Sequence, residues 1–198
     1  MKIGVDFDGV VIAIDRLIHR LAVEAGFITD DVLPRAKEIC AHLERLGQAQ
    51  RWDALADEAH GVWHADAPAW SGVHDFFRRG RQRGLSLVIV GQRPRERWEQ
   101  AQDWLARQGF FNPYDIALPR PSVFFEATLV AQTERLRALG CTHFISDRAA
   151  ILEHPTFPAS VRKILFEPEP SDAVVSGATT RARGWNHLSE FFLSPGTR

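Results

Sequence analysis

MKIGVDFDGVVIAID, residues 1–15, is an apolar run that is interrupted by two aspartates one residue apart, Asp6 and Asp8. A buried parallel strand can be continuously apolar, whereas a buried carboxylate costs free energy unless it has a partner such as a cation. Gly9 follows the second aspartate and permits the chain to turn sharply. We therefore interpret this stretch as a strand whose C-terminal end presents two carboxylates at a turn.

Five short apolar runs predict β-strands: residues 2–7, 85–90, 114–118, 142–146 and 162–166. Apolar residues at helical spacing predict helices over 95–109 and 126–140, between the later strands. We interpret residues 167–183 as a loop and expect a short helix near 186–193. Strands that alternate with helices are typical of right-handed crossovers and a mainly parallel sheet, so the predicted fold class is α/β.

A long segment without a convincing strand separates the first predicted strand from the second. Helical spacing predicts three helices in this segment and one crossover helix after it, at residues 14–26, 30–47, 51–64 and 74–83. We therefore place an α/β core domain at residues 1–13 and 71–198 and a helical insertion at residues 14–70. The insertion is too long for an ordinary connection, and we expect it to cover a site beside the first strand.

Polar residues follow three of the predicted strands: Asp6 and Asp8, then GQRPR at 91–95, then Ser146 and Asp147. In an open parallel sheet, ligands bind beyond the carboxyl ends of the strands, near the point where strand order reverses. If the first strand is central, the three strand ends converge on one crevice. This convergence makes the strand ends the candidate functional site.

Composition restricts the partners of the chain. Its 198 residues are 45% hydrophobic and 25% charged, and the net charge of -1 does not indicate attraction to nucleic acid or to a membrane. Cys40 and Cys141 are too few for a disulfide framework. No apolar run approaches the ~20 residues that cross a bilayer, and no export signal precedes the first strand. We expect a cytoplasmic protein.

Two motifs resemble those of the haloacid dehalogenase-like (HAD) superfamily. VDFDGVV, residues 5–11, resembles the nucleophile motif, and FISDRAAIL, residues 144–152, resembles the acidic metal motif. A helical insertion directly after the first strand also resembles the superfamily's cap. The resemblance implies a Rossmann-like three-layer core with a helical cap, and a Mg²⁺-dependent phosphomonoesterase that acts on a small phosphorylated metabolite.

The same resemblance implies roles for three aspartates. Asp6 would attack phosphorus to form an aspartyl-phosphate, and Asp8 would protonate the leaving oxygen and then activate water. The Asp6 carboxylate, the Asp8 backbone carbonyl and Asp147 would hold Mg²⁺, which neutralises phosphoryl charge and aligns the attack. Ser146 stands where related sequences often carry a second acid.

Two positions depart from the superfamily's pattern. Gly91 stands where a Ser or Thr usually binds the phosphoryl oxygens, and Gln132 stands where spacing places the usual lysine. Arginines near the strand ends could substitute, because a guanidinium binds phosphate bidentately. The candidate substrate-binding residues are Gly91, Gln92, Arg93, Arg120 and Gln132, with Arg95 as a further arginine near a strand end.

A second interpretation of these departures stays open. The loss of one charge-stabilising donor can cost on the order of 10²–10³ in rate, so a site that lacks two could be slow or inactive. The protein would then bind a phosphorylated ligand, or a protein partner through the insertion, without turnover. The sequence does not indicate the oligomeric state.

Overall fold

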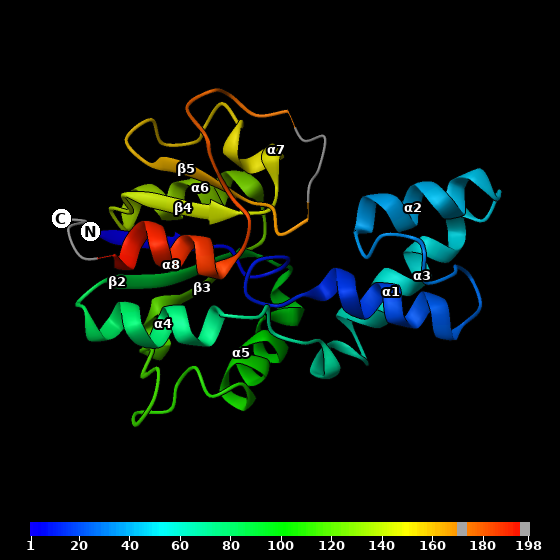
Figure 1. Ribbon diagram of the computed structural model, residues 1–198, viewed down its shortest axis with the longest axis horizontal. Helices are drawn as coiled ribbons and strands as arrows, with labels where there is room; N and C mark the ends of the chain where they lie inside the picture. Colours follow the sequence, from blue (N-terminus) through cyan, green and yellow to red (C-terminus); the bar gives the residue numbers. More distant parts are fainter. Residues whose placement is uncertain (170–173, 195–198) are drawn as a thin grey trace. The chain divides into compact units, whose positions relative to one another are not determined.

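The structure, a computed structural model, describes residues 1–169 and 174–194. The chain divides into two units, one formed by Met1–Val11 with Trp70–Arg198 and the other by Ile12–Ala69 (Figure 1). We call the first the core unit and the second the helical unit. The expected position of the helical insertion over the strand ends stays a prediction.

A six-stranded sheet forms the centre of the core unit. Its strands are β1 (Lys2–Val5), β2 (Ser86–Gln92), β3 (Val123–Glu126), β4 (His143–Ser146), β5 (Arg162–Phe166) and β6 (Thr180–Ala182). Their order across the sheet is β3-β2-β1-β4-β5-β6, and all five pairings are parallel. Strand order reverses at β1, which lies between β2 and β4. The predicted α/β class with a central first strand is confirmed.

Helices cover both faces of this sheet, which gives the three layers of a Rossmann-like fold (Figure 1). On one face, α4 (Val73–Gln82) packs against α8 (Trp185–Leu193). The Phe110 ring contacts both Phe77 of α4 and Trp104 of α5 (Trp98–Arg107). On the other face, α6 (Leu129–Ala138) packs against β2 and β3, and α7 (Ala149–Leu152) packs against β4 and β5. An aromatic cluster of Phe76, Phe77, Trp185 and Phe192 fills the α4–α8 side.

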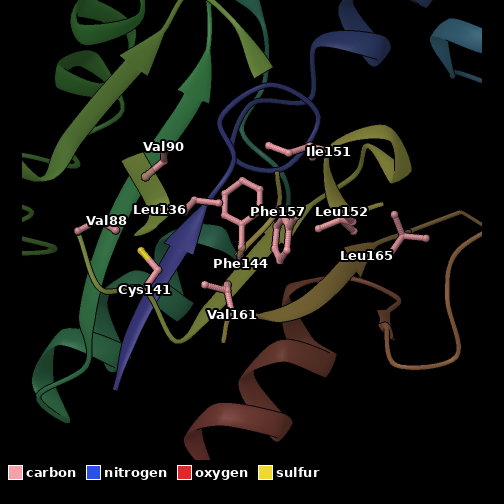
Figure 2. Close-up of a cluster of buried hydrophobic side chains, with 10 residues drawn as sticks. All are labelled: Val88, Val90, Leu136, Cys141, Phe144, Ile151, Leu152, Phe157, Val161 and Leu165. Carbon is pink, nitrogen blue, oxygen red and sulfur yellow. The ribbon is translucent and has the colours of Figure 1, made fainter. Parts of the chain in front are cut away.

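Figure 2 shows the hydrophobic cluster on the α6 side of the sheet. It consists of Val88, Val90, Leu136, Cys141, Phe144, Ile151, Leu152, Phe157, Val161 and Leu165. Each fully buried Val, Leu, Ile or Phe stabilises the fold by roughly 1.5–3 kcal/mol relative to exposure. Gly4 of β1 lies against this cluster, because a Cβ there would come within 2.9 Å of Leu136 Cδ2. The missing side chain lets α6 approach the central strand closely.

The strand predicted at residues 114–118 does not form, and two observed strands were not predicted. Residues 114–118 contain a turn: Ala117 has φ 52°, and its N–H donates to the Asn112 carbonyl at 2.9 Å. The third strand is instead β3, whose last residue, Glu126, was assigned to the helix predicted over 126–140. The edge strand β6 lies within residues 167–183, which were interpreted as a loop and of which 170–173 lie outside the described residues.

The helical unit contains three helices near the predicted positions: α1 (Ile14–Glu24), α2 (Ala36–Arg45) and α3 (Ala49–His60). Its apolar interior includes Leu17, Ile18, Leu21, Ile39, Leu43, Leu55 and Ala59. The two ends of the unit meet in an antiparallel bridge between Ile12 and Ala69. A carboxylate oxygen of Asp15 accepts the backbone N–H of Ala36 at 2.9 Å, which satisfies a donor at the start of α2.

Three short 3₁₀ segments complete the described elements: η1 (His64–Asp66), η2 (Arg95–Arg97) and η3 (Arg120–Ser122). Within residues 1–169 and 174–194, no helix has both the length and the apolar character that crossing a membrane requires.

Candidate functional site

Asp6 directly follows the central strand β1 and is 1% exposed. Its Oδ1 accepts the backbone N–H of Phe7 at 2.9 Å and Nε2 of Gln132 at 3.2 Å. Its Oδ2 accepts the Ser146 hydroxyl at 2.7 Å and Nη2 of Arg148 at 3.2 Å. Each carboxylate oxygen therefore has two donors, and these donors hold a buried negative charge in a fixed orientation.

Strand alternation explains why these groups meet. Successive side chains of a strand point to opposite faces of the sheet. Gln92 at the end of β2, Ser146 at the end of β4 and Asp6 after β1 all point to the face that α6 covers. Gln132 lies in the first turns of α6, and its Nε2 also donates to the Val90 carbonyl at 2.7 Å. Three strands and one helix thus converge on Asp6.

Arg148 is the cation of this cluster, and the sequence analysis did not single it out. Its Nη1 donates to Gln92 Oε1 at 2.7 Å, and its Nη2 donates to Gln132 Oε1 at 2.8 Å as well as to Asp6. The Arg148 side chain is 37% exposed, whereas the Asp6 side chain is 2% exposed. The guanidinium therefore connects the buried carboxylate to solvent.

Asp6 and Arg148 each shift the pKa of the other. Burial raises the pKa of the Asp6 carboxyl and the nearby charge of Asp8 adds to this, while the Arg148 charge and the Ser146 hydroxyl act to lower it. Burial acts to lower the pKa of the Arg148 guanidinium, but the charges of Asp6, Asp147 and Asp8 raise it above its usual value. Arg148 therefore stays protonated beside three carboxylates.

Asp8, the expected general acid, is held by Arg93. Arg93 Nε donates to Asp8 Oδ2 at 2.9 Å and Nη2 donates to Oδ1 at 2.6 Å, which makes a bidentate ion pair. The Arg93 side chain is 3% exposed, and that of Asp8 is 25% exposed. The guanidinium carbon also lies 5.0 Å from the Phe7 ring centroid. Arg93 thus orients Asp8 from the buried side and leaves part of the carboxylate accessible.

Asp147 lies against the turn that follows Asp8. Gly9 has φ 73°, and a Cβ added there would lie 1.8 Å from Asp147 Oδ2. Both the backbone conformation and the close approach therefore require glycine. The structure thus brings Asp6, Asp8 and Asp147 together around one turn at the carboxyl end of the central strand.

Gly91 does not face Asp6. An added Cβ would lie 3.0 Å from Phe7 Cβ and 3.0 Å from Phe125 Cδ1, on the face of the sheet opposite to the one that Gln92 faces. A hydroxyl at this position would therefore point into packed rings. Position 91 was expected to be the place where a phosphate-binding hydroxyl has been lost. The structure corrects this expectation, because the side chain of β2 that reaches the Asp6 cluster is that of Gln92.

Arg120 also lies apart from the Asp6 cluster. It precedes β3, at the amino end of that strand, and its guanidinium carbon lies 4.3 Å from the Phe111 ring centroid. Its expected role in substrate binding is therefore not supported by its position. Arg95 begins η2 and is exposed. Of the three arginines expected to bind phosphate, Arg93 is the one that contacts a site carboxylate.

The Asp6 carboxylate, which was expected to hold Mg²⁺, is not arranged to bind it. Mg²⁺ demands near-octahedral oxygen ligands at about 2.0–2.1 Å. Both Asp6 oxygens already accept two hydrogen bonds, and a guanidinium nitrogen of Arg148 lies 3.2 Å from Oδ2. An ion on that oxygen would displace donors and meet the positive charge of Arg148, so the arrangement does not fit the ion.

Side chains of Asp, Glu, His or Cys do not gather in threes into a possible metal site anywhere in residues 1–169 and 174–194.

No protein-family model matches the chain, and no curated protein matches its sequence. Solved structures match its fold across nearly its whole length. Protein tyrosine kinase A (PtkA) of Mycobacterium tuberculosis matches with a TM-score of 0.63 at 12% identity, over 96% of both chains. A HAD family hydrolase from Deinococcus radiodurans with bound phosphate and sodium matches at 0.55 and 14% identity, over 96% of this chain and 94% of that one.

The magnesium-bound HAD-hydrolase YfnB of Bacillus subtilis matches with a TM-score of 0.51 at 15% identity, over 96% of this chain and 97% of that one. These likenesses, together with the strand order and the helices on both faces, show that the chain has a HAD-like fold. The resemblance of its two motifs is consistent with that fold.

Proposed function

We propose that this protein is a hydrolase of phosphate monoesters on small phosphorylated metabolites, with Asp6 as its nucleophile. The observation that carries the proposal is the position of Asp6 at the carboxyl end of the central strand, with Asp8 beside it and the Arg148 guanidinium against it. Ligands of open parallel sheets bind at this place. The HAD-like structure with bound phosphate is consistent with the proposal at the level of the fold.

The chemistry takes two steps. In the first, an Asp6 oxygen attacks phosphorus, the phosphorus–oxygen bond to the alcohol breaks, and the leaving oxygen takes a proton from Asp8. In the second, Asp8 takes a proton from water, the water oxygen attacks phosphorus, and the bond to Asp6 breaks to release phosphate. Arg93 holds Asp8 as the carboxylate that accepts the proton from water, and this proton is the one that Asp8 gives to the leaving oxygen in the next turnover.

Magnesium has no step in this proposal, because the Asp6 carboxylate expected to hold it already accepts hydrogen bonds from Ser146 and Arg148. The resemblance implies a Mg²⁺ requirement, whereas the contacts of Asp6 do not favour one. Phosphate release measured with Mg²⁺ and with EDTA distinguishes the two, because turnover that stops in EDTA and returns with Mg²⁺ would support the requirement.

The proposal is tested by phosphate release from a panel of sugar phosphates, nucleotides and phosphonates. Asp6→Asn should reduce turnover by at least about 10³-fold, since an amide is a poor nucleophile. Asp103→Asn, an exposed aspartate of α5, is the matched control and should retain wild-type activity. Turnover in Asp6→Asn equal to that of the wild type would refute the role of Asp6.

The same panel distinguishes the hydrolase from the alternative, a protein that binds a phosphorylated ligand or a partner without turnover. No phosphate release from any ester, together with thermal stabilisation by one of them, would favour the binding role. Release of halide from a 2-halo acid in place of phosphate would instead assign carbon–halogen hydrolysis.

A further inference from the structure

The cation of the candidate site differs from the one that the resemblance implies. A lysine is expected at position 132 and a metal ion at Asp6, whereas the chain places an amide at 132 and a guanidinium against Asp6. We propose that Arg148 is the phosphoryl-binding cation of this site and that phosphate binds there without a divalent metal ion. This inference rests on the proposed function, because it names the group that binds the substrate's phosphoryl oxygens.

Arg148 is positioned for this role by three acceptors. Gln92 Oε1 accepts from Nη1, while Gln132 Oε1 and Asp6 Oδ2 accept from Nη2. A guanidinium carries five N–H donors in a rigid fork, so these bonds fix its plane and still leave donors for a ligand. The 37% exposure of the side chain allows an oxyanion to approach from solvent.

Gln132 suits an arginine partner better than the expected lysine would. Its amide donates to Asp6 and to the Val90 carbonyl, and its carbonyl oxygen accepts from Arg148. A lysine ammonium has three donors and no acceptor, so it could not hold the guanidinium and would repel it. Gln132 and Arg148 therefore form a matched pair in which the amide orients the charge.

Arg93 is not positioned to take this role. Its Nε and Nη2 already donate to Asp8, and its side chain is 3% exposed. Arg148 instead lies close enough to Asp6 and Asp147 for both carboxylates to raise its pKa. An incoming phosphoryl group next to Asp6 would meet a negative charge, and Arg148 is the cation that compensates it there.

The test is isothermal titration calorimetry of the full chain with inorganic phosphate, in EDTA and again in Mg²⁺. The wild type should bind phosphate in EDTA, and Arg148→Gln should weaken that binding at least tenfold. Arg148→Lys keeps the charge but lacks the forked donors of the guanidinium, so its phosphate affinity should lie between those of the wild type and Arg148→Gln. Arg107→Gln, an exposed arginine at the end of α5, is the matched control and should bind like the wild type.

A thermal melt of each variant separates loss of binding from loss of fold, and Arg148→Lys keeps the test usable if Arg148→Gln does not fold. Three results would overturn the inference: phosphate binding by the wild type only in Mg²⁺, wild-type affinity in Arg148→Gln, or no phosphate binding by the wild type under either condition.

The two proposals fail separately. Arg148-dependent phosphate binding in EDTA without turnover of any ester would refute the hydrolase and leave the role of Arg148 intact. Ester turnover that needs Asp6 and Mg²⁺ but proceeds fully in Arg148→Gln would refute the role of Arg148 and leave the hydrolase intact.

Discussion

Gln132 Oε1 accepts a hydrogen bond from Arg148 Nη2 at 2.8 Å, while Nε2 of the same amide donates to Asp6 at 3.2 Å. One fully buried amide therefore links the candidate nucleophile to its cation. An amide can do this because it carries both donors and an acceptor, whereas the lysine usual at this position carries donors alone.

Replacing Gln132 with lysine should disrupt the cluster instead of restoring a phosphatase site. The ammonium would remove the acceptor of Arg148 and place two cations together, and a buried group left without its partner costs about 1–3 kcal/mol. We expect Gln132→Lys to lower the free energy of unfolding by that amount, measured by urea denaturation, with no gain in phosphate release.

Gln82→Lys is the matched control, because Gln82 is exposed at the end of α4 and its replacement should change neither quantity. A large gain of phosphate release in Gln132→Lys would contradict this account and show that the site lacks only its lysine.

A side chain at position 91 should destabilise the protein without improving phosphate binding. Gly91→Ser would place Cβ 3.0 Å from Phe7 Cβ and from Phe125 Cδ1, and such overpacking costs about 1–3 kcal/mol. Gly177→Ser is the control, because a Cβ there meets no atom within 4 Å. Urea denaturation and phosphate calorimetry of both variants check this. Tighter phosphate binding in Gly91→Ser would show that its hydroxyl reaches the site after all.

The Asp8–Arg93 ion pair should respond unequally to the loss of either partner. Asp8→Ala removes the bidentate carboxylate from a guanidinium that is 3% exposed, whereas Arg93→Met keeps an apolar stem beside a carboxylate that is 25% exposed. Burying an uncompensated charge is the larger penalty. We expect Asp8→Ala to lower the free energy of unfolding by about 1–3 kcal/mol more than Arg93→Met. Equal losses, or the reverse order, would contradict the pairing.

His143 should make the fold less stable in mild acid. Burial lowers the pKa of His143, and the charges of Arg162 and the N-terminus lower it further. The unfolded state therefore binds more protons than the folded state once the pH falls below about 6.5, and stability falls with pH there, by at most about 1.4 kcal/mol per pH unit. His143→Phe should reduce the loss in unfolding free energy between pH 7.5 and pH 5.

The measurement for this prediction is urea denaturation at both pH values. His187→Gln, an exposed histidine of α8, is the control and should keep the wild-type difference between them. A His143→Phe variant with the same difference as the wild type would rule out His143 as its source. The phenyl ring should retain the edge contact that the imidazole makes with Phe192 at 5.1 Å.

The sequence predicted those parts of the fold that periodicity reports directly. The first strand, the mainly parallel sheet and the long helices follow from buried apolar runs. Residues 114–118 resembled a strand because Ile116 and Leu118 are buried, yet a turn buries them equally well. β3 was missed because it has only four residues, and the helix predicted over 126–140 began at its last residue, Glu126.

The site was predictable where a residue's role depends on its place at a strand end. Asp6, Asp8 and Asp147, which the sequence placed at strand ends, lie around the turn at Gly9. Arg148 was not found, because its position depends on acceptors from β2 and α6 that only the folded chain brings together. A basic residue directly after Asp147, inside the acidic motif, was the available signal.

The order of the sheet also has a consequence for the kinetics of folding. Ile3 of β1 pairs with Leu87 of β2 and with His143 of β4, both much later in the chain. Such distant contacts form slowly, because the entropy of closing long loops opposes them until both partners are in place. The helical unit, whose internal contacts all lie within residues 12–69, can fold sooner. The Asp6 carboxylate gains its partners from α6 and from the segment after β4 only late, so the site should form in a single step with the sheet.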